Sequence, residues 1–270
     1  MAVTITAMNL ARDAFLVASS AAAGAINSVA GGGTLLSFPA ALAAGLPPLM
    51  ANASNAVALT PGSLAAAWSY RHFLGDKKRL AAQLALPAMG GAALGAIILR
   101  HTKPSVFEAI VPWLILGATL VMLVQQLGLR FGAGAAPAAV PVPARQARRR
   151  LALVILFQFL VGIYGGYFGG AMGIVMLAYL SLVGGMEIHQ MNAIKNALAG
   201  LINGVASVYF VARGMVDGRA AALMTVGAIL GGIAGARVAR RIQPRLVRWM
   251  VIAIGLGLAA VFALRGFGKS

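Results

Sequence analysis

The chain has 270 residues, of which 60% are hydrophobic and 10% charged, and its mean hydropathy is +0.88. Soluble domains are only about half apolar, so this composition indicates a polytopic membrane protein and excludes an ordinary soluble domain. The 22 Lys and Arg outnumber the 5 Asp and Glu. These basic residues fall between apolar runs and form no single basic face, so nucleic acid is not an expected partner.

Apolar runs broken by glycines, prolines and basic loops predict an all-α fold with two sets of helical segments. The first set is predicted at residues 12–30, 34–46, 50–71, 80–99 and 106–127. The second set is predicted at residues 151–168, 172–184, 190–211, 220–238 and 246–265. In each set a glycine-rich break separates two short segments, and three helices near the ~20 residues that span a bilayer follow. A cleaved signal peptide at 14–25 is the alternative for the first segment, although its only preceding basic residue, Arg12, is followed by Asp13.

The two halves of the chain align with each other when the sequence is shifted by 141 positions. The shift pairs, without a gap, Gly24 with Gly165, Gly32 with Gly173, Asn55 with Asn196, Asp76 with Asp217 and Arg100 with Arg241. We therefore predict two homologous repeats, residues 1–130 and 151–270, joined by an Ala/Pro/Arg-rich linker at 131–150. A count of charges leaves open whether the repeats are parallel or inverted. Short Gly-interrupted segments at matching positions favour inverted repeats with a binding site at the bilayer midplane, which is the interpretation we adopt.

Basic residues also predict the orientation of the chain in the membrane. The predicted spans place segments 71–79 and 128–150 on the same side, and these segments are rich in Lys and Arg, whereas only Arg100 and Lys103 lie between the second and third spans. By the positive-inside rule, the linker 128–150 is expected to be cytoplasmic. Binding of anionic lipid by the Arg cluster is the alternative role of that segment.

The two glycine-rich breaks are the first candidate site. They read INSVAGGGTLLSFP at 26–39 and YGGYFGGAMGIVM at 164–176. Backbone N–H groups at the start of the following helices, near Thr34 and Gly173, are predicted to face an anion, and the helix dipole would add to the attraction. Close packing of small residues is the alternative explanation. The candidate binding residues of the breaks are Asn27, Gly32, Gly33, Thr34, Tyr164 and Gly173.

A polar stripe on the helix after each break is the second candidate site. Four residues share one helical face at spacings of three, four and seven, namely Asn192, Lys195, Asn196 and Asn203. The first half repeats the stripe with Asn52, Asn55, Gly62 and Ser63. A charged residue inside a membrane costs at least ~2.5 kcal/mol, so Lys195 is predicted to bind the substrate. No acidic residue is near it on the helix, which suggests an unpartnered cation that attracts an anion. Snorkelling toward the membrane surface is the alternative for Lys195.

Both halves resemble the TauE/SafE family, whose members are also described as sulfite exporters. The first half carries the resemblance in AGAINSVAGGGTLLSFPAALAAGLPPLMANASNAVALTPGSLAAAWSYR, residues 23–71. The second carries it in GIYGGYFGGAMGIVMLAYLSL and MNAIKNALAGLINGVASVYF, residues 162–182 and 191–210. The resemblance covers essentially the whole chain. It implies a transporter of small sulfur-containing anions, sulfite or an organosulfonate, in the bacterial plasma (inner) membrane.

The sequence and the resemblance together predict a secondary transporter that exports such an anion by alternating access around the two breaks. An anion channel, or a permease for another small organic anion, is the alternative. The chain has no cysteine, 3 His and 5 acidic residues, and these are scattered, so neither an enzyme nor a cofactor or metal site is expected. The expected partners are a small anion and the lipid bilayer. A second copy of the chain remains an open possibility, as does a purely structural role.

Overall fold

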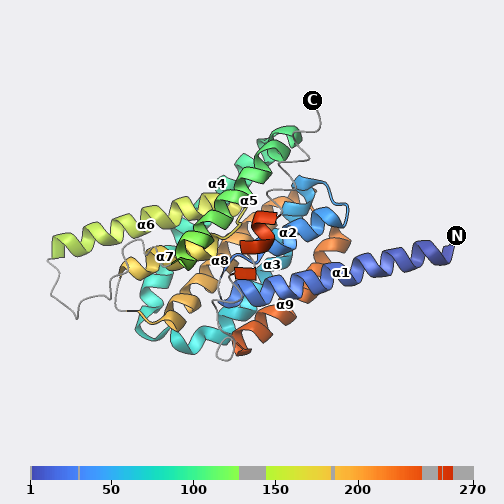
Figure 1. Ribbon diagram of the computed structural model, residues 1–270. Coiled ribbons are helices and arrows are strands. Elements are labelled where there is room, and N and C mark those ends of the chain that lie inside the picture. The colour runs from blue at the N-terminus through green and yellow to red at the C-terminus, as the bar shows by residue number, and fades with distance from the viewer. Residues whose placement is uncertain are drawn as a thin grey trace.

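The computed structural model describes residues 2–29, 31–127, 144–183, 186–238, 249–250 and 252–257. Within these residues every extended regular element is a helix and no strand occurs, which confirms the predicted all-α fold (Figure 1). The helices of the first half are α1 (Ala2–Val29), α2 (Thr34–Ala43), α3 (Pro48–Tyr70), α4 (Lys78–His101) and α5 (Pro104–Gln126). Those of the second half are α6 (Ala144–Tyr167), α7 (Met172–Val183), α8 (Ile188–Ala212) and α9 (Gly218–Val238).

The first helix of each half is longer than the sequence pattern predicts. Helix α1 has 28 residues and α6 has 24, whereas α2 and α7 have 10 and 12. Neither residues 2–23 nor residues 144–161 contain a glycine or proline to stop the helix. Helix α6 therefore includes Arg148–Arg150, the end of the predicted linker. The rest of the linker and most of the segment predicted at 246–265 lie outside the described residues.

Two close helix pairs join the first half to the second, and glycines form both contacts. Helix α9 packs on α1 through Gly227 and Gly231, which lie against the backbones of Val17 and Ala21. Helix α4 packs on α6 in the same way through Gly91, which lies against the carbonyl of Phe159. The GxxxG spacings at Gly91/Gly95 and Gly231/Gly235 thus bring helices close together. They also place each half's first long helix against the other half's fourth helix.

The contacts also show the direction in which the helices run. Residue numbers rise together along α1 and α9, since Gly227 meets Val17 and Gly235 meets Ala25, so this pair is parallel. In α3 and α8 they rise in opposite directions, since Gly200 meets Leu64 and Gly204 meets Thr60. Helices α3 and α8, which occupy equivalent positions in the two halves, are therefore antiparallel. Figure 1 likewise shows α1 and α6 approaching the centre of the molecule from opposite ends.

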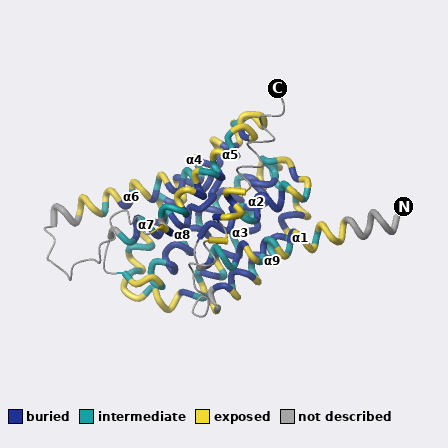
Figure 2. The backbone as a smooth tube through the Cα atoms, viewed as in Figure 1, coloured by how far each residue is buried: buried dark blue, intermediate teal, exposed yellow. Residues whose placement is uncertain are grey.

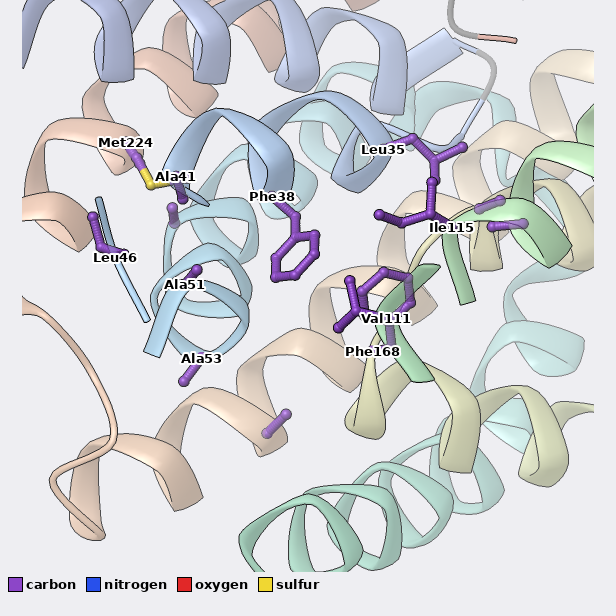
Figure 3. Packing of buried hydrophobic residues seen from close by; sticks show 14 of the residues in the cluster. Leu35, Phe38, Ala41, Leu46, Ala51, Ala53, Val111, Ile115, Phe168 and Met224 are labelled. Carbon is purple, nitrogen blue, oxygen red and sulfur yellow. The ribbon is translucent and has the colours of Figure 1, made fainter. Parts of the chain in front are cut away.

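The interior is apolar and the outer surface suits lipid. Buried residues gather where the helices meet, around α3 and α8 (Figure 2). Leu35 and Phe38 of α2 belong to the same buried cluster as Ile115 of α5 and Phe168 at the end of α6 (Figure 3). The segments described that are long and apolar enough to cross a membrane are Gly75–His101, Pro104–Val124, Arg148–Tyr167, Ile188–Ala212 and Gly218–Gly235. The chain is therefore a multi-pass membrane protein by the character of its helices.

The glycine contacts predict a difference between two Gly→Ala substitutions. A methyl group at Gly231 would collide with the carbonyl oxygen of Ala21, whereas a methyl group at Gly117 in α5 would meet nothing within 4 Å. Gly231→Ala is expected to destabilise the fold by about 1–3 kcal/mol through overpacking. Gly117→Ala is expected to stabilise it slightly, by up to ~1 kcal/mol, because alanine favours a helix. Thermal unfolding of the detergent-solubilised protein tests both, and equal midpoints would contradict the α1–α9 packing.

Candidate functional site

The two glycine-rich breaks touch each other in the centre of the structure. Gly31 and Gly32 follow α1 with φ values of +75° and +90°, and Gly169 follows α6 with +75°. A Cβ on Gly31 would lie 2.8 Å from the carbonyl carbon of Gly173, so the two backbones meet where no side chain fits. Glycine is needed at Gly31 both for its positive φ and for this close approach. The two breaks therefore meet through their glycines.

Lys195 of α8 lies beside this contact and does not snorkel. Its side chain is 1% exposed, and its methylene groups pack near Gly173. The ammonium Nζ donates hydrogen bonds to the carbonyl oxygens of Asn27, at 2.7 Å, and Ser28, at 3.3 Å. These are carbonyls of the last turn of α1, the end of a helix that favours a cation. The expectation of an unpartnered Lys195 is therefore wrong, because backbone carbonyls bind it.

The ends of α1 and α6 are bound crosswise by the opposite half. Asn196 joins Lys195 in binding the end of α1, since its Nδ2 donates to the carbonyl of Ser28 at 3.1 Å. In the first half, Asn52 of α3 donates through Nδ2 to the carbonyl of Tyr167, the last residue of α6, at 2.9 Å. Each polar stripe thus satisfies carbonyls that the other half leaves open where its helix breaks.

Other predicted residues of the breaks have local partners. The Nδ2 group of Asn27 donates to Oγ of Ser63 on α3 at 3.2 Å, so Asn27 belongs to the Lys195 cluster. The hydroxyl of Tyr164 donates to the carbonyl of Gly170 within its own break at 2.6 Å. Thr34 is buried at the start of α2, and Gly33 lies against the backbone of Ala23. Gly32 faces side chains of the second half, with Ile174 nearest.

Several buried amides of the stripes keep an atom without a hydrogen-bond partner. These atoms are Oδ1 of Asn55, Asn192 and Asn196, and Nδ2 of Asn203. A side-chain amide has both donor and acceptor groups, and an unsatisfied buried polar group costs roughly 1–3 kcal/mol. The stripes therefore hold polar groups beyond those that the present contacts use. Among the described residues no group of three or more His, Asp or Glu is placed to bind a metal ion.

Sequence reasoning missed the residues that act through their backbone. Ser28 and Tyr167 contribute carbonyl oxygens, and a carbonyl is present at every position, so no residue type marks these two. Ser63 was noted as part of the stripe but not as a partner of Asn27. A buried pair between α6 and α7, in which the hydroxyl of Tyr179 donates to Gln158, was also missed. Gln158, a polar residue among apolar neighbours, was its only sequence signal.

Comparison with known proteins identifies the family. The model of the family "Sulfite exporter TauE/SafE" matches residues 16–262. The chain belongs to the TauE/SafE family. It is 29% identical to "Probable membrane transporter protein ORF9" of Sinorhizobium sp., over 91% of this chain and 90% of that protein. It is 28% identical to "Probable membrane transporter protein YfcA" of Escherichia coli strain K12, over 92% and 88%. No solved structure matches the chain.

Family membership confirms the resemblance inferred from the two glycine-rich breaks. A relative from Haemophilus influenzae, also named "Probable membrane transporter protein", is 26% identical over 87% of this chain and 88% of its own. Together with the spanning helices, these relatives point to a membrane transporter of the TauE/SafE family rather than to an enzyme.

The crosswise contacts predict that Asn52 stabilises the fold. Asn52→Leu keeps the size of the side chain but leaves the carbonyl of Tyr167 without its donor, which is expected to cost about 1–3 kcal/mol. Asn9→Leu is the matched control, because Asn9 is exposed on α1 and is expected to change stability little. The measurement is the thermal midpoint of both purified variants. An unchanged midpoint for Asn52→Leu would show that the bond across the halves contributes nothing.

Proposed function

We propose that this TauE/SafE protein transports small sulfur-containing anions, sulfite or organosulfonates, and exports them across the bacterial inner membrane. The observation that carries the proposal is the buried ammonium of Lys195 at the contact of the two breaks. Intramembrane basic residues mark ion pathways, and the family description names sulfite. The substrate-binding residues are proposed to be Lys195, its partner Asn27 and the stripe amides of α3 and α8.

In the proposed mechanism the anion replaces the carbonyls that bind Lys195. An anion and the ammonium attract each other as opposite charges, and this attraction, which neutral carbonyls lack, is strong where water is excluded. An anion that reaches Lys195 therefore competes well with the carbonyls of Asn27 and Ser28. Displacing them releases the end of α1 from α8, which loosens the contact between the halves. Substrate binding is thereby coupled to movement at the breaks, as alternating access requires.

An inverted arrangement of the halves is part of this proposal. It is supported by the antiparallel course of α3 and α8 and by the opposite directions from which α1 and α6 reach the centre (Figure 1). Helices α4 and α6 run parallel, since Gly91 meets Phe159 and Gly95 meets Ile163. Their basic starts, at Lys78 and Arg148, therefore lie at one end of the molecule. By the positive-inside rule we assign that end, and the linker, to the cytoplasm.

The membrane potential is sufficient to drive export of a monoanion. A potential of 100 mV, negative inside, favours its exit by ~2.3 kcal/mol, which corresponds to roughly 50-fold accumulation outside at RT ≈ 0.59 kcal/mol. Four of the five acidic residues lie at or near helix ends, and the fifth, Asp13 in the middle of α1, forms an exposed ion pair with Arg219. We therefore propose export without a coupled proton.

Flux from proteoliposomes with an imposed potential tests the proposal. The wild type is expected to release sulfite or an alkylsulfonate with a saturable rate, faster when the interior is negative. Lys195→Gln is expected to reduce the rate at least tenfold, since it removes the charge that binds the anion. Lys195→Arg keeps the charge and is expected to retain part of the rate. Lys103→Gln, which removes an exposed cation between α4 and α5, is the matched control.

Each possible result tests a different part of the proposal. A wild type that moves neither anion would refute the substrate assignment but not the family. Equal rates for wild type and Lys195→Gln would refute the role of Lys195. Rates that do not respond to the potential would refute potential-driven export. A flux that rises linearly with concentration would indicate the alternative, an anion channel.

A further inference from the structure

A second site lies at the end of the molecule opposite the basic starts of α4 and α6. It is a pocket of about 290 Å³ between both halves of the chain. Its walls are the start of α3, the end of α4, the start of α5 and the residues that follow α8; the lining residues used below are Pro48, Met50, Arg100, Glu108, Arg213 and Met215. At ~30 Å³ per water molecule, the pocket has the volume of roughly ten waters. It is large enough for a small organic molecule.

Two arginines give this outer pocket a positive charge. Arg100 comes from the last turn of α4 and Arg213 from the residue after α8, and Glu108 is the acidic residue in the lining. Neither arginine forms an ion pair with Glu108 in the described part of the chain, where the ion pairs are Lys77–Asp76 and Arg219–Asp13. The guanidinium of Arg213 instead lies 5.4 Å from the ring centroid of Tyr209. Both guanidinium groups thus keep donors for an anion.

The start of α3 adds further attraction for an anion. The cap position is Pro47 and the helix begins at Pro48, and no side chain caps this end. Because proline has no N–H, the first backbone donors of the helix are those of Leu49 and Met50, which also line the pocket. The positive end of the α3 dipole therefore opens into the same space as the two arginines.

The remaining lining is apolar, and this defines the class of ligand. Pro48, Met50 and Met215 present hydrocarbon and thioether surface beside the charged groups. An arginine at the end of α4 or α8 is explained by the helix dipole alone. The dipole does not explain, however, why two arginines from different halves line the same pocket, or why that pocket also has an apolar wall. A ligand that matches both features has an anionic head group and a short apolar body.

We propose that this outer pocket binds small organic monoanions with a short alkyl group, such as an alkylsulfonate, on the non-cytoplasmic side of the membrane. The inference rests on the proposed function in one respect, since it makes the pocket the outer vestibule of the transport path. The head group binds Arg100 and Arg213, and the alkyl group contacts the apolar wall. Bare sulfite, which has no alkyl group, binds this pocket more weakly.

Calorimetric titration of the purified full chain with ethanesulfonate, and separately with sulfite, tests the proposal. The titration is done in a Lys195→Gln background, which removes the proposed central site. There the chain is expected to bind ethanesulfonate, and adding the pair Arg100→Gln/Arg213→Gln is expected to raise the dissociation constant at least tenfold. Arg71→Gln is the matched control, because Arg71 is also an exposed arginine stacked on an aromatic ring, that of Trp68. It lies at the other end of α3 and is expected to leave binding unchanged. The same arginine substitutions, made in the wild type, are assayed for ethanesulfonate flux in proteoliposomes.

The outcomes separate this inference from the proposed function. In the Lys195→Gln background, ethanesulfonate binding that persists without the two arginines would overturn the inference. Sulfite binding as tight as that of ethanesulfonate in this background, and lost equally without the two arginines, would overturn the role of the apolar wall. Binding that depends on the two arginines, together with a wild type that transports no anion, would support the pocket while the proposed function fails. A single Met50→Asp substitution, expected to abolish binding, checks the site without removing either arginine.

Discussion

The structure depends on how the carbonyl groups of two broken helices are satisfied away from water. Helices α1 and α6 end near the centre of the molecule, and the last carbonyls of a helix have no partner within it. The hydrocarbon chains of lipids have no hydrogen-bond donor for these carbonyl groups. Asn52 supplies one for α6, and Lys195 and Asn196 supply them for α1. Each half therefore supplies hydrogen-bond donors to the broken helix of the other half. Without the other half, these helix-end carbonyl groups would lack those donors.

The same contacts make the centre a suitable place for movement. Gly31 and Gly173 meet backbone to backbone, so no side chains interlock at that point of contact. The donors that do hold them belong to side chains with rotatable bonds, and Asn55 and Asn192 have buried oxygens that the present arrangement does not use. A change of arrangement would exchange one set of polar contacts for another instead of exposing polar groups to lipid. That exchange keeps the energetic cost of a second conformation low.

Sequence reasoning predicted the helices and the breaks well because both have local causes. Apolar runs gave the positions of α3, α4, α5, α8 and α9, and glycines gave the ends of α1 and α6. The starts of α1 and α6 were predicted too late, because helix continues through polar residues when no glycine or proline stops it. The partners of Lys195 were missed, because backbone carbonyls have no sequence signature. Arg100 was interpreted as a topology signal only and Arg213 was not singled out, since 113 positions of sequence separate these two residues that line one pocket.

The antiparallel course of α3 and α8 relates the two candidate sites to the two faces of the membrane. Pro48 lines the outer pocket, and Asn52 lies four residues further along α3, about 6 Å at 1.5 Å per residue. Lys195 lies seven residues from the start of α8, about 10 Å from the opposite face by the same rise. Each polar stripe thus begins near a different membrane face and reaches the broken helix of the other half. The proposed duplication and inversion of one unit would give this result, because one amide-bearing helix would then serve each face. An anion that leaves the proposed site at Lys195 toward the outer pocket would therefore pass from the stripe of α8 to that of α3.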